Sequence, residues 1–176
     1  MSAELELTSR SPAETEALGE RLGRALGPGA VVALFGDLGS GKTCLVRGLA
    51  RGLGVAGPVS SPTYVLMQEY AGRLPLYHFD AWMQGREATF LEGGGAEWLH
   101  AGGVAVVEWA DRVLEWLPEP RLELRLVHRG PEERRVAVRA VGDDPALTAL
   151  LEGLRPRERT AEGTAEGAAE DRAAGR

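Results

Sequence analysis

The stretch LFGDLGSGKTCL, residues 34–45, combines glycines, a lysine and a threonine at a spacing that suits a phosphate group. Gly36, Gly41, Lys42 and Thr43 satisfy the pattern G-x-x-x-x-G-K-[ST]. Glycines let main-chain amides point inward and approach a phosphate closely, and the N-terminus of a following helix adds positive charge. In this chemistry the lysine reaches the β- and γ-phosphates, and the threonine hydroxyl takes one position on Mg²⁺. We therefore predict a nucleotide-phosphate site here.

Lys42 is the only lysine of the chain, which otherwise uses 19 arginines. An ammonium is compact and flexible, whereas a guanidinium is a planar fork, so the exception favours a phosphate site over a chance glycine turn. The chain has no asparagine, and the N-K-x-D loop that commonly selects guanine therefore cannot form. By elimination, the sequence favours ATP. Cys44 stands one step into the following helix, and we interpret it as a packing residue.

Two carboxylates stand at the ends of apolar segments and could complete the site. Asp80 ends LYHFD, and Glu108 ends VAVVE. If these segments are strands parallel to 31–35, both acids emerge at the edge where the glycine loop opens. One acid would bind Mg²⁺ while the other orients or deprotonates the attacking water, and the sequence leaves open which does which. The alternative is that each acid caps a following helix.

The segment SSPTY, residues 60–64, follows the helix after the glycine loop. Pro62 keeps Ser61 extended, and Thr63 could offer its hydroxyl to the γ-phosphate and the metal. An ordinary Ser-Pro turn into a strand is an equal alternative. His78, within LYHFD, is interpreted as a strand residue with a hydrogen-bond partner.

Hydrophobic periodicity predicts the elements that position these residues. Ser11, Pro12 and Glu14 form a helix-start signal. Strands are expected at 5–9, 30–36, within 60–70 and 74–82, and at 104–109, 121–128 and 134–141. Helices are expected at 11–26, 42–53, 110–117 and 145–154, with a weak helical pattern over 92–99. We predict an α/β fold with a mixed sheet flanked by helices, a single domain over 1–154 with a C-terminal β-hairpin.

The composition limits the class of protein. The chain has 176 residues, of which 44% are hydrophobic, and a net charge of -6 that disfavours a direct grip on nucleic acid. The N-terminus is polar, and no apolar run approaches the roughly 20 residues of a membrane span. With one cysteine there is no internal disulfide. We expect a cytoplasmic protein without membrane contact, and a disordered tail over 155–176 that is biased to Ala, Gly and Glu.

Four segments in this order, GDLGSGKT, SPTY, YHFD and VEW, resemble the TsaE family, small bacterial ATPases of tRNA threonylcarbamoyladenosine synthesis. The resemblance covers roughly residues 5–140 and implies a P-loop α/β fold that binds and slowly hydrolyses ATP with Mg²⁺. It also implies work with the TsaD and TsaB proteins, which attach threonylcarbamoyl to tRNA. In the family, hydrolysis is thought to drive or reset that complex, so tRNA is met through it.

The resemblance also implies roles for individual residues. Thr43 and Glu108 would hold Mg²⁺, Asp80 would lie by the γ-phosphate, and Thr63 would belong to a switch-like loop. Trp109 would lie near the nucleotide. Ser11 would be a candidate for contact with the base. The phosphates would lie in a cradle formed by Asp37, Leu38, Gly39, Ser40, Gly41, Lys42 and Thr43, with Cys44 beside it.

Two departures and two rival functions qualify the resemblance. Cys44 replaces a usual Thr or Ser, and AWMQGRE follows YHFD where the family carries a Tyr-Arg pair, which makes Arg86 the nearest substitute. A small-molecule kinase that transfers the γ-phosphate to a hydroxyl acceptor is one rival. Such a kinase needs a mobile lid that carries arginines, and the segment 83–103 has a single arginine, Arg86, which argues against a lid there. A nucleotide-dependent adaptor with negligible chemistry of its own is the other.

Overall fold

The computed structural model describes residues 4–82 and 85–156. The chain order of its strands and helices is β1 (Glu4–Ser9), α1 (Pro12–Ala25), β2 (Val31–Phe35), α2 (Lys42–Gly52), β3 (Met67–Tyr70), β4 (Leu76–Asp80), α3 (Arg86–Glu92), β5 (Val104–Glu108), β6 (Arg121–His128), β7 (Arg134–Val141) and α4 (Pro145–Leu154). Short 3₁₀ helices are η1 (Gly95–His100), η2 (Ala110–Arg112) and η3 (Leu114–Trp116). The tail predicted at 155–176 lies, apart from its first two residues, outside the described residues.

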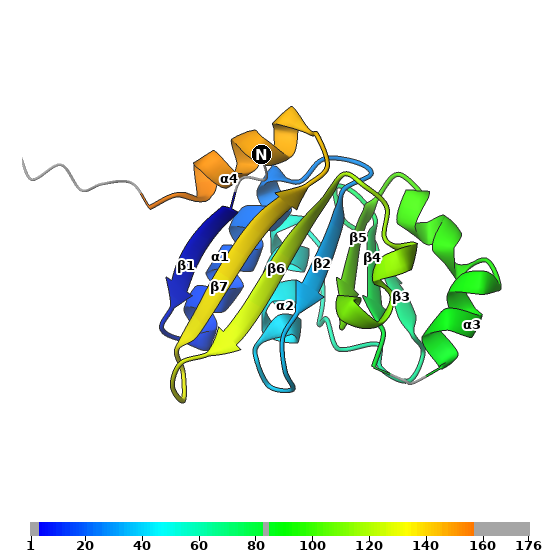
Figure 1. Cartoon of the computed structure of the whole chain (residues 1–176), viewed down its shortest axis with the longest axis horizontal. Coiled ribbons are helices and arrows are strands. Elements are labelled where there is room, and N and C mark those ends of the chain that lie inside the picture. Colours follow the sequence, from blue (N-terminus) through cyan, green and yellow to red (C-terminus); the bar gives the residue numbers. More distant parts are fainter. Residues whose placement is uncertain (1–3, 83–84, 157–176) are drawn as a thin grey trace, which may run out of the picture.

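The strands form one seven-stranded sheet in the order β1-β7-β6-β2-β5-β4-β3. Strands β6, β2, β5 and β4 run parallel, whereas β1, β7 and β3 pair antiparallel with their neighbours. Figure 1 shows α1 and α2 behind the sheet and the α3 segment beside β3 and β4. The predicted single-domain α/β fold with a mixed sheet and a late hairpin, β6–β7, is confirmed. Among the described residues, no helix combines the length and apolar character needed to cross a membrane.

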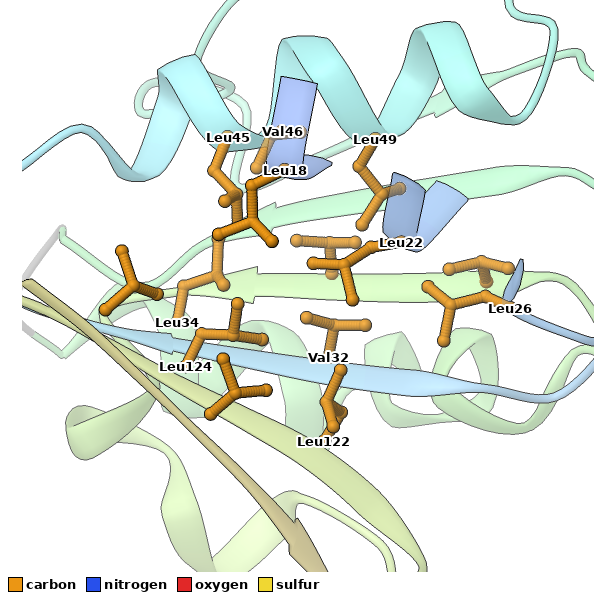
Figure 2. Close-up of a cluster of buried hydrophobic side chains, with 14 of the residues drawn as sticks. Leu18, Leu22, Leu26, Val32, Leu34, Leu45, Val46, Leu49, Leu122 and Leu124 are labelled. Atoms are coloured by element: carbon orange, nitrogen blue, oxygen red, sulfur yellow. The ribbon is translucent and has the colours of Figure 1, made fainter. Parts of the chain in front are cut away.

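The larger core lies between the sheet and helices α1 and α2. Figure 2 shows leucines from both helices meeting side chains of β2 and β6, and the labelled residues are Leu18, Leu22, Leu26, Val32, Leu34, Leu45, Val46, Leu49, Leu122 and Leu124. A second core covers the opposite face of β2, β5 and β4. Strand β2 is buried along its whole length, as its continuous apolar run predicts, because both faces are covered.

Glycines bring α1 and α2 into main-chain contact. A Cβ built on Gly48 would lie 1.9 Å from the carbonyl oxygen of Glu16, and one on Gly19 would lie 2.1 Å from that of Leu45. Any side chain at these positions would push the helices apart. The close approach fixes α2, whose first residue is Lys42, tightly against the rest of the domain.

Two predicted helical segments differ from the structure. The weak pattern over 92–99 falls on η1 and the last residue of α3, which are separated at Gly94, with a φ of 111°; the rest of α3, from Arg86, has no counterpart among the predicted elements. The helix expected over 110–117 is instead η2 and η3. Ala110 and Val113 are both buried, and their three-residue spacing fits the repeat of a 3₁₀ helix.

Candidate nucleotide-phosphate site

The glycine loop joins the buried strand β2 to α2, at the same end of the sheet as the β6–β7 turn (Figure 1). Gly36, Gly39 and Gly41 all have positive φ, of 145°, 73° and 102°. A Cβ on Gly36 would lie 2.5 Å from the carbonyl oxygen of Leu126, so the loop packs directly on β6. Glycine is required here for conformation and for space.

Lys42 is almost fully buried, with 3% of its surface exposed. Its Nζ donates to the carbonyl oxygens of Gly36 at 2.6 Å and Asp37 at 2.9 Å, and approaches the hydroxyl of Ser40 at 3.4 Å. Burial lowers the pKa of Lys42, and the nearby Glu108 carboxylate opposes that shift. The ammonium therefore lies over the loop, held by oxygens that a phosphate could replace.

Trp109 lies directly under this ammonium, with Nζ of Lys42 at 3.8 Å from the ring centroid. Trp109 packs on Trp82 with centroids 4.4 Å apart, and the guanidinium of Arg112 lies 4.9 Å from the Trp82 ring. Arg112 also donates to the carbonyl oxygen of Trp82 at 2.9 Å. The backbone of Trp109 has a φ of 58°, a conformation that costs about 1 kcal/mol or more in a non-glycine residue. The packing of the Trp109 ring against Trp82 and the Lys42 ammonium favours this backbone conformation.

Glu108 and Asp80 are register partners on the parallel strands β5 and β4. Both carboxylates are buried, and Oγ1 of Thr43 lies 3.0 Å from each oxygen of Glu108. A hydroxyl and a carboxylate are hard oxygen donors that fit Mg²⁺. Among the described residues, no group of three or more His, Cys, Asp or Glu side chains could hold a metal by itself. A cation here would thus share Thr43 and Glu108 with phosphate and water oxygens, as Mg²⁺ sites commonly do.

Asp80 anchors the segment that contains Thr63. Its Oδ2 accepts hydrogen bonds from the hydroxyls of Ser61 and Thr63, the latter at 2.8 Å, and its Oδ1 accepts from the amide of Trp82 at 3.0 Å. The next residue, Tyr64, is 82% exposed. Asp80 therefore fixes the base of a loop whose tip faces solvent.

Two residues that sequence reasoning left without a role support the site. His78, expected to be a strand residue with an unspecified hydrogen-bond partner, approaches Glu108 with Nε2 at 2.8 Å from Oε1. Arg134 donates to the carbonyl oxygens of Ser40 at 3.1 Å and Gly39 at 3.4 Å. No local pattern marks Arg134, which is 94 residues from Ser40 in the chain. The YHFD motif does draw attention to His78.

The loop, the strand-end acids and the 61–63 segment line one cleft. Its lining residues are Leu38, Gly39, Ser40, Gly41, Lys42, Thr43, Cys44, Arg47, Ser61, Thr63, Asp80, Trp82, Glu108 and Trp109. Ser11, predicted to contact the base, is not among these lining residues; its side chain accepts from the amide of Glu14 as the N-cap of α1. Asp37 contributes its carbonyl oxygen to Lys42. Cys44 donates to the carbonyl oxygen of Pro12 at 3.3 Å, and burial raises the pKa of its thiol.

Comparisons with known proteins identify relatives over most of the chain. The family model described as threonylcarbamoyl adenosine biosynthesis protein TsaE matches residues 9–136. The chain is 41% identical over 134 residues to the tRNA threonylcarbamoyladenosine biosynthesis protein TsaE of Bacillus subtilis, covering 76% of this chain and 84% of that protein. The protein of the same name from Treponema pallidum is 43% identical to this chain over 131 residues, and the match covers 73% of this chain and 97% of the Treponema protein.

A solved structure is similar to the fold as well. The crystal structure of YdiB from Bacillus subtilis superimposes with a TM-score of 0.73 and 35% identity, covering 87% of this chain and 97% of that one. The fold of this chain is thus shared with a solved bacterial protein, and the family follows from the sequence matches. The chain belongs to the TsaE family.

Proposed function

We propose that this protein binds ATP with Mg²⁺ in the cleft, hydrolyses it slowly, and acts in tRNA threonylcarbamoyladenosine biosynthesis in the cytoplasm. Hydrolysis drives or resets a complex of the TsaD and TsaB proteins, and tRNA is met only through that complex. Membership of the TsaE family supports the pathway. The observation that carries the chemistry is the convergence of Lys42, Thr43, Asp80 and Glu108 on one cleft from α2, β4 and β5.

Each group has a distinct role in this proposal. Lys42 exchanges the carbonyl oxygens of Gly36 and Asp37 for the β- and γ-phosphates, and main-chain amides of the loop donate to the same phosphates. Thr43 and Glu108 hold Mg²⁺, which when bound neutralises phosphate charge. The 3.0 Å contact between their oxygens supports that pairing.

Asp80 positions the 61–63 loop beside the γ-phosphate. Both of its oxygens are already engaged, by Ser61, Thr63 and the Trp82 amide, so it sets the place of the Thr63 hydroxyl. The Trp109 ring closes the wall of the cleft next to Lys42. Water attacks poorly unless it is positioned, and we therefore expect partner proteins to stimulate turnover.

Titration with ATP and GTP, in Mg²⁺ and in EDTA, tests the binding proposal. Lys42→Ala is expected to abolish ATP binding, and Glu108→Ala to remove the dependence of binding on Mg²⁺. Glu115→Ala, in η3 outside the cleft lining, is the control and binds as the parent does. Normal ATP binding by Lys42→Ala would refute the assignment of the loop.

The fate of the γ-phosphate separates the proposed activity from its rivals. With labelled ATP, inorganic phosphate is the expected product, released faster when TsaD and TsaB are added. Label on a hydroxyl acceptor would identify a kinase. Release that is negligible under both conditions would leave a nucleotide-dependent adaptor.

A further inference from the structure

His78 is completely buried, and one of its ring nitrogens meets no partner among the residues that the structure describes. The parallel register places His78 opposite Val106, two residues before the Asp80–Glu108 pair. Its Nε2 lies 2.8 Å from Oε1 of Glu108. Its Nδ1 is also buried and meets no hydrogen-bond partner within the part of the chain that the structure describes. Among the described residues, the carboxylate of Glu108 is thus the single polar contact of this ring.

The unequal surroundings of the two nitrogens fix the position of the ring proton. An ionised carboxylate only accepts hydrogen bonds, so Nε2 of His78 must donate. A second proton on Nδ1 would be a buried N–H without an acceptor, which is rarer and costlier than an unpaired lone pair. The ring is therefore the tautomer that carries its proton on Nε2, and it presents one donor to Glu108.

Glu108 depends on this donor more than its present contacts suggest. Thr43 has one hydroxyl proton, shared between two carboxylate oxygens at equal distance. When the Thr43 oxygen turns a lone pair to a cation, that proton can leave Glu108. Lys42 bonds to Gly36, Asp37 and Ser40 rather than to the carboxylate. His78 then remains as the side chain that prevents the carboxylate from rotating.

We propose that His78 is a positioning residue for the divalent cation. Its Nε2–H holds Oε1 of Glu108, so the carboxylate keeps its orientation towards Thr43 and binds the cation more tightly. This inference rests on the proposed role of Glu108 as a metal ligand. Removing a partner of this kind typically weakens metal binding 10- to 100-fold, which sets the effect to expect.

Two substitutions separate the donor from the shape of the ring. His78→Gln places an amide N–H near the position of Nε2, whereas His78→Leu fills the space without a donor. Leu76→Val, on the same strand and face and equally buried, controls for packing. Mn²⁺ affinity is measured calorimetrically with a non-hydrolysable ATP analogue bound, and analogue affinity is measured in EDTA.

We expect His78→Leu to weaken Mn²⁺ binding about 10- to 100-fold with little change in EDTA. His78→Gln and Leu76→Val are expected to stay within about threefold of the parent on the same scale. Unchanged Mn²⁺ affinity in His78→Leu would overturn the inference, as would equal weakening in His78→Gln. If Glu108→Ala also keeps full Mn²⁺ affinity, the metal role in the proposed function fails as well. If only Glu108→Ala weakens it, the inference alone fails.

A measurement on the parent protein does not depend on whether variants fold. Nitrogen-15 NMR of labelled histidine, recorded without nucleotide or metal, reports which ring nitrogen carries the proton. A slowly exchanging proton on Nε2 of His78 supports the inference. A proton on Nδ1, with Nε2 bare, would overturn it.

Discussion

Replacing Arg134 by Gln tests whether the glycine loop is held from outside the cleft. The guanidinium of Arg134 donates to five carbonyl oxygens, those of Gly39, Ser40, Gly130, Pro131 and Glu133. It therefore ties the phosphate loop to the turn between β6 and β7. Because these contacts hold the Gly39 and Ser40 carbonyl oxygens, we expect them to keep the loop in the shape that a phosphate needs.

The structure sets the size of the effect. Two of the five bonds reach the loop, and the one to Gly39, at 3.4 Å, is long. We count the bond to Ser40 alone, and a hydrogen bond from a charged donor contributes about 1.5 kcal/mol at the lower end of its range. That energy corresponds to about a tenfold rise in the Kd for ATP.

Calorimetric titration with ATP measures this change, with two matched variants. Arg135→Gln removes the same charge from the next residue, which points to the other face and pairs with Glu6 at 3.6 Å. It is expected to bind ATP as the parent does. Arg134→Lys keeps the charge without the fork, so it should bind almost as weakly as Arg134→Gln. Parent-like binding by Arg134→Lys would refute the geometric explanation and leave only long-range electrostatics.

Three further predictions concern the packing, the loop and the acid limb of stability. Gly48→Ala should destabilise the protein by about 3 kcal/mol, because its Cβ would overlap the Glu16 carbonyl. Gly153→Ala has open space around it and should be neutral or stabilise the protein by up to about 1 kcal/mol. Urea unfolding that gave the same sign for both variants would contradict this packing. Asp80→Ala removes the acceptor of Ser61 and Thr63, so hydrogen exchange of the amides of residues 61 and 63–66 should quicken about tenfold while β2 is unaffected. Unchanged exchange would show that another contact holds the loop. Burial alone would raise the pKa of Glu123, but bonds from Arg139 and Arg121 outweigh it and lower the pKa, so this carboxylate stabilises the fold at neutral pH and loses that contribution as pH falls through its folded pKa. Glu123→Gln should therefore flatten the decline of stability between about pH 5 and pH 3, and an equally steep decline in urea or thermal unfolding would count against the ion pairs.

Local patterns in the sequence determined the parts of the site that lie close together in the chain. The spacing of Gly36, Gly41, Lys42 and Thr43 and the apolar run before them predict a strand, a loop and a helix, because each signal acts within a few residues. Ser11 likewise marks the start of α1. The apolar segments before Asp80 and Glu108 indicate strands whose ends carry the acids.

The tertiary structure alone decided which distant residues support that site. The sheet places β2 between β5 and β6, so the glycine loop has Glu108 on one side and the β6–β7 turn with Arg134 on the other. His78 reaches Glu108, 30 residues away, only because β4 pairs with β5 in a particular register. Hydrophobic patterning indicates that a strand exists, but β2, β4 and β5 are buried along their whole length, so their continuous apolar runs carry no signal for which strand lies beside which, or in what register. The order and register of the strands come from how the whole set of buried faces packs together. That packing therefore also decides that Arg134 reaches the glycine loop and that His78 reaches the Glu108 carboxylate.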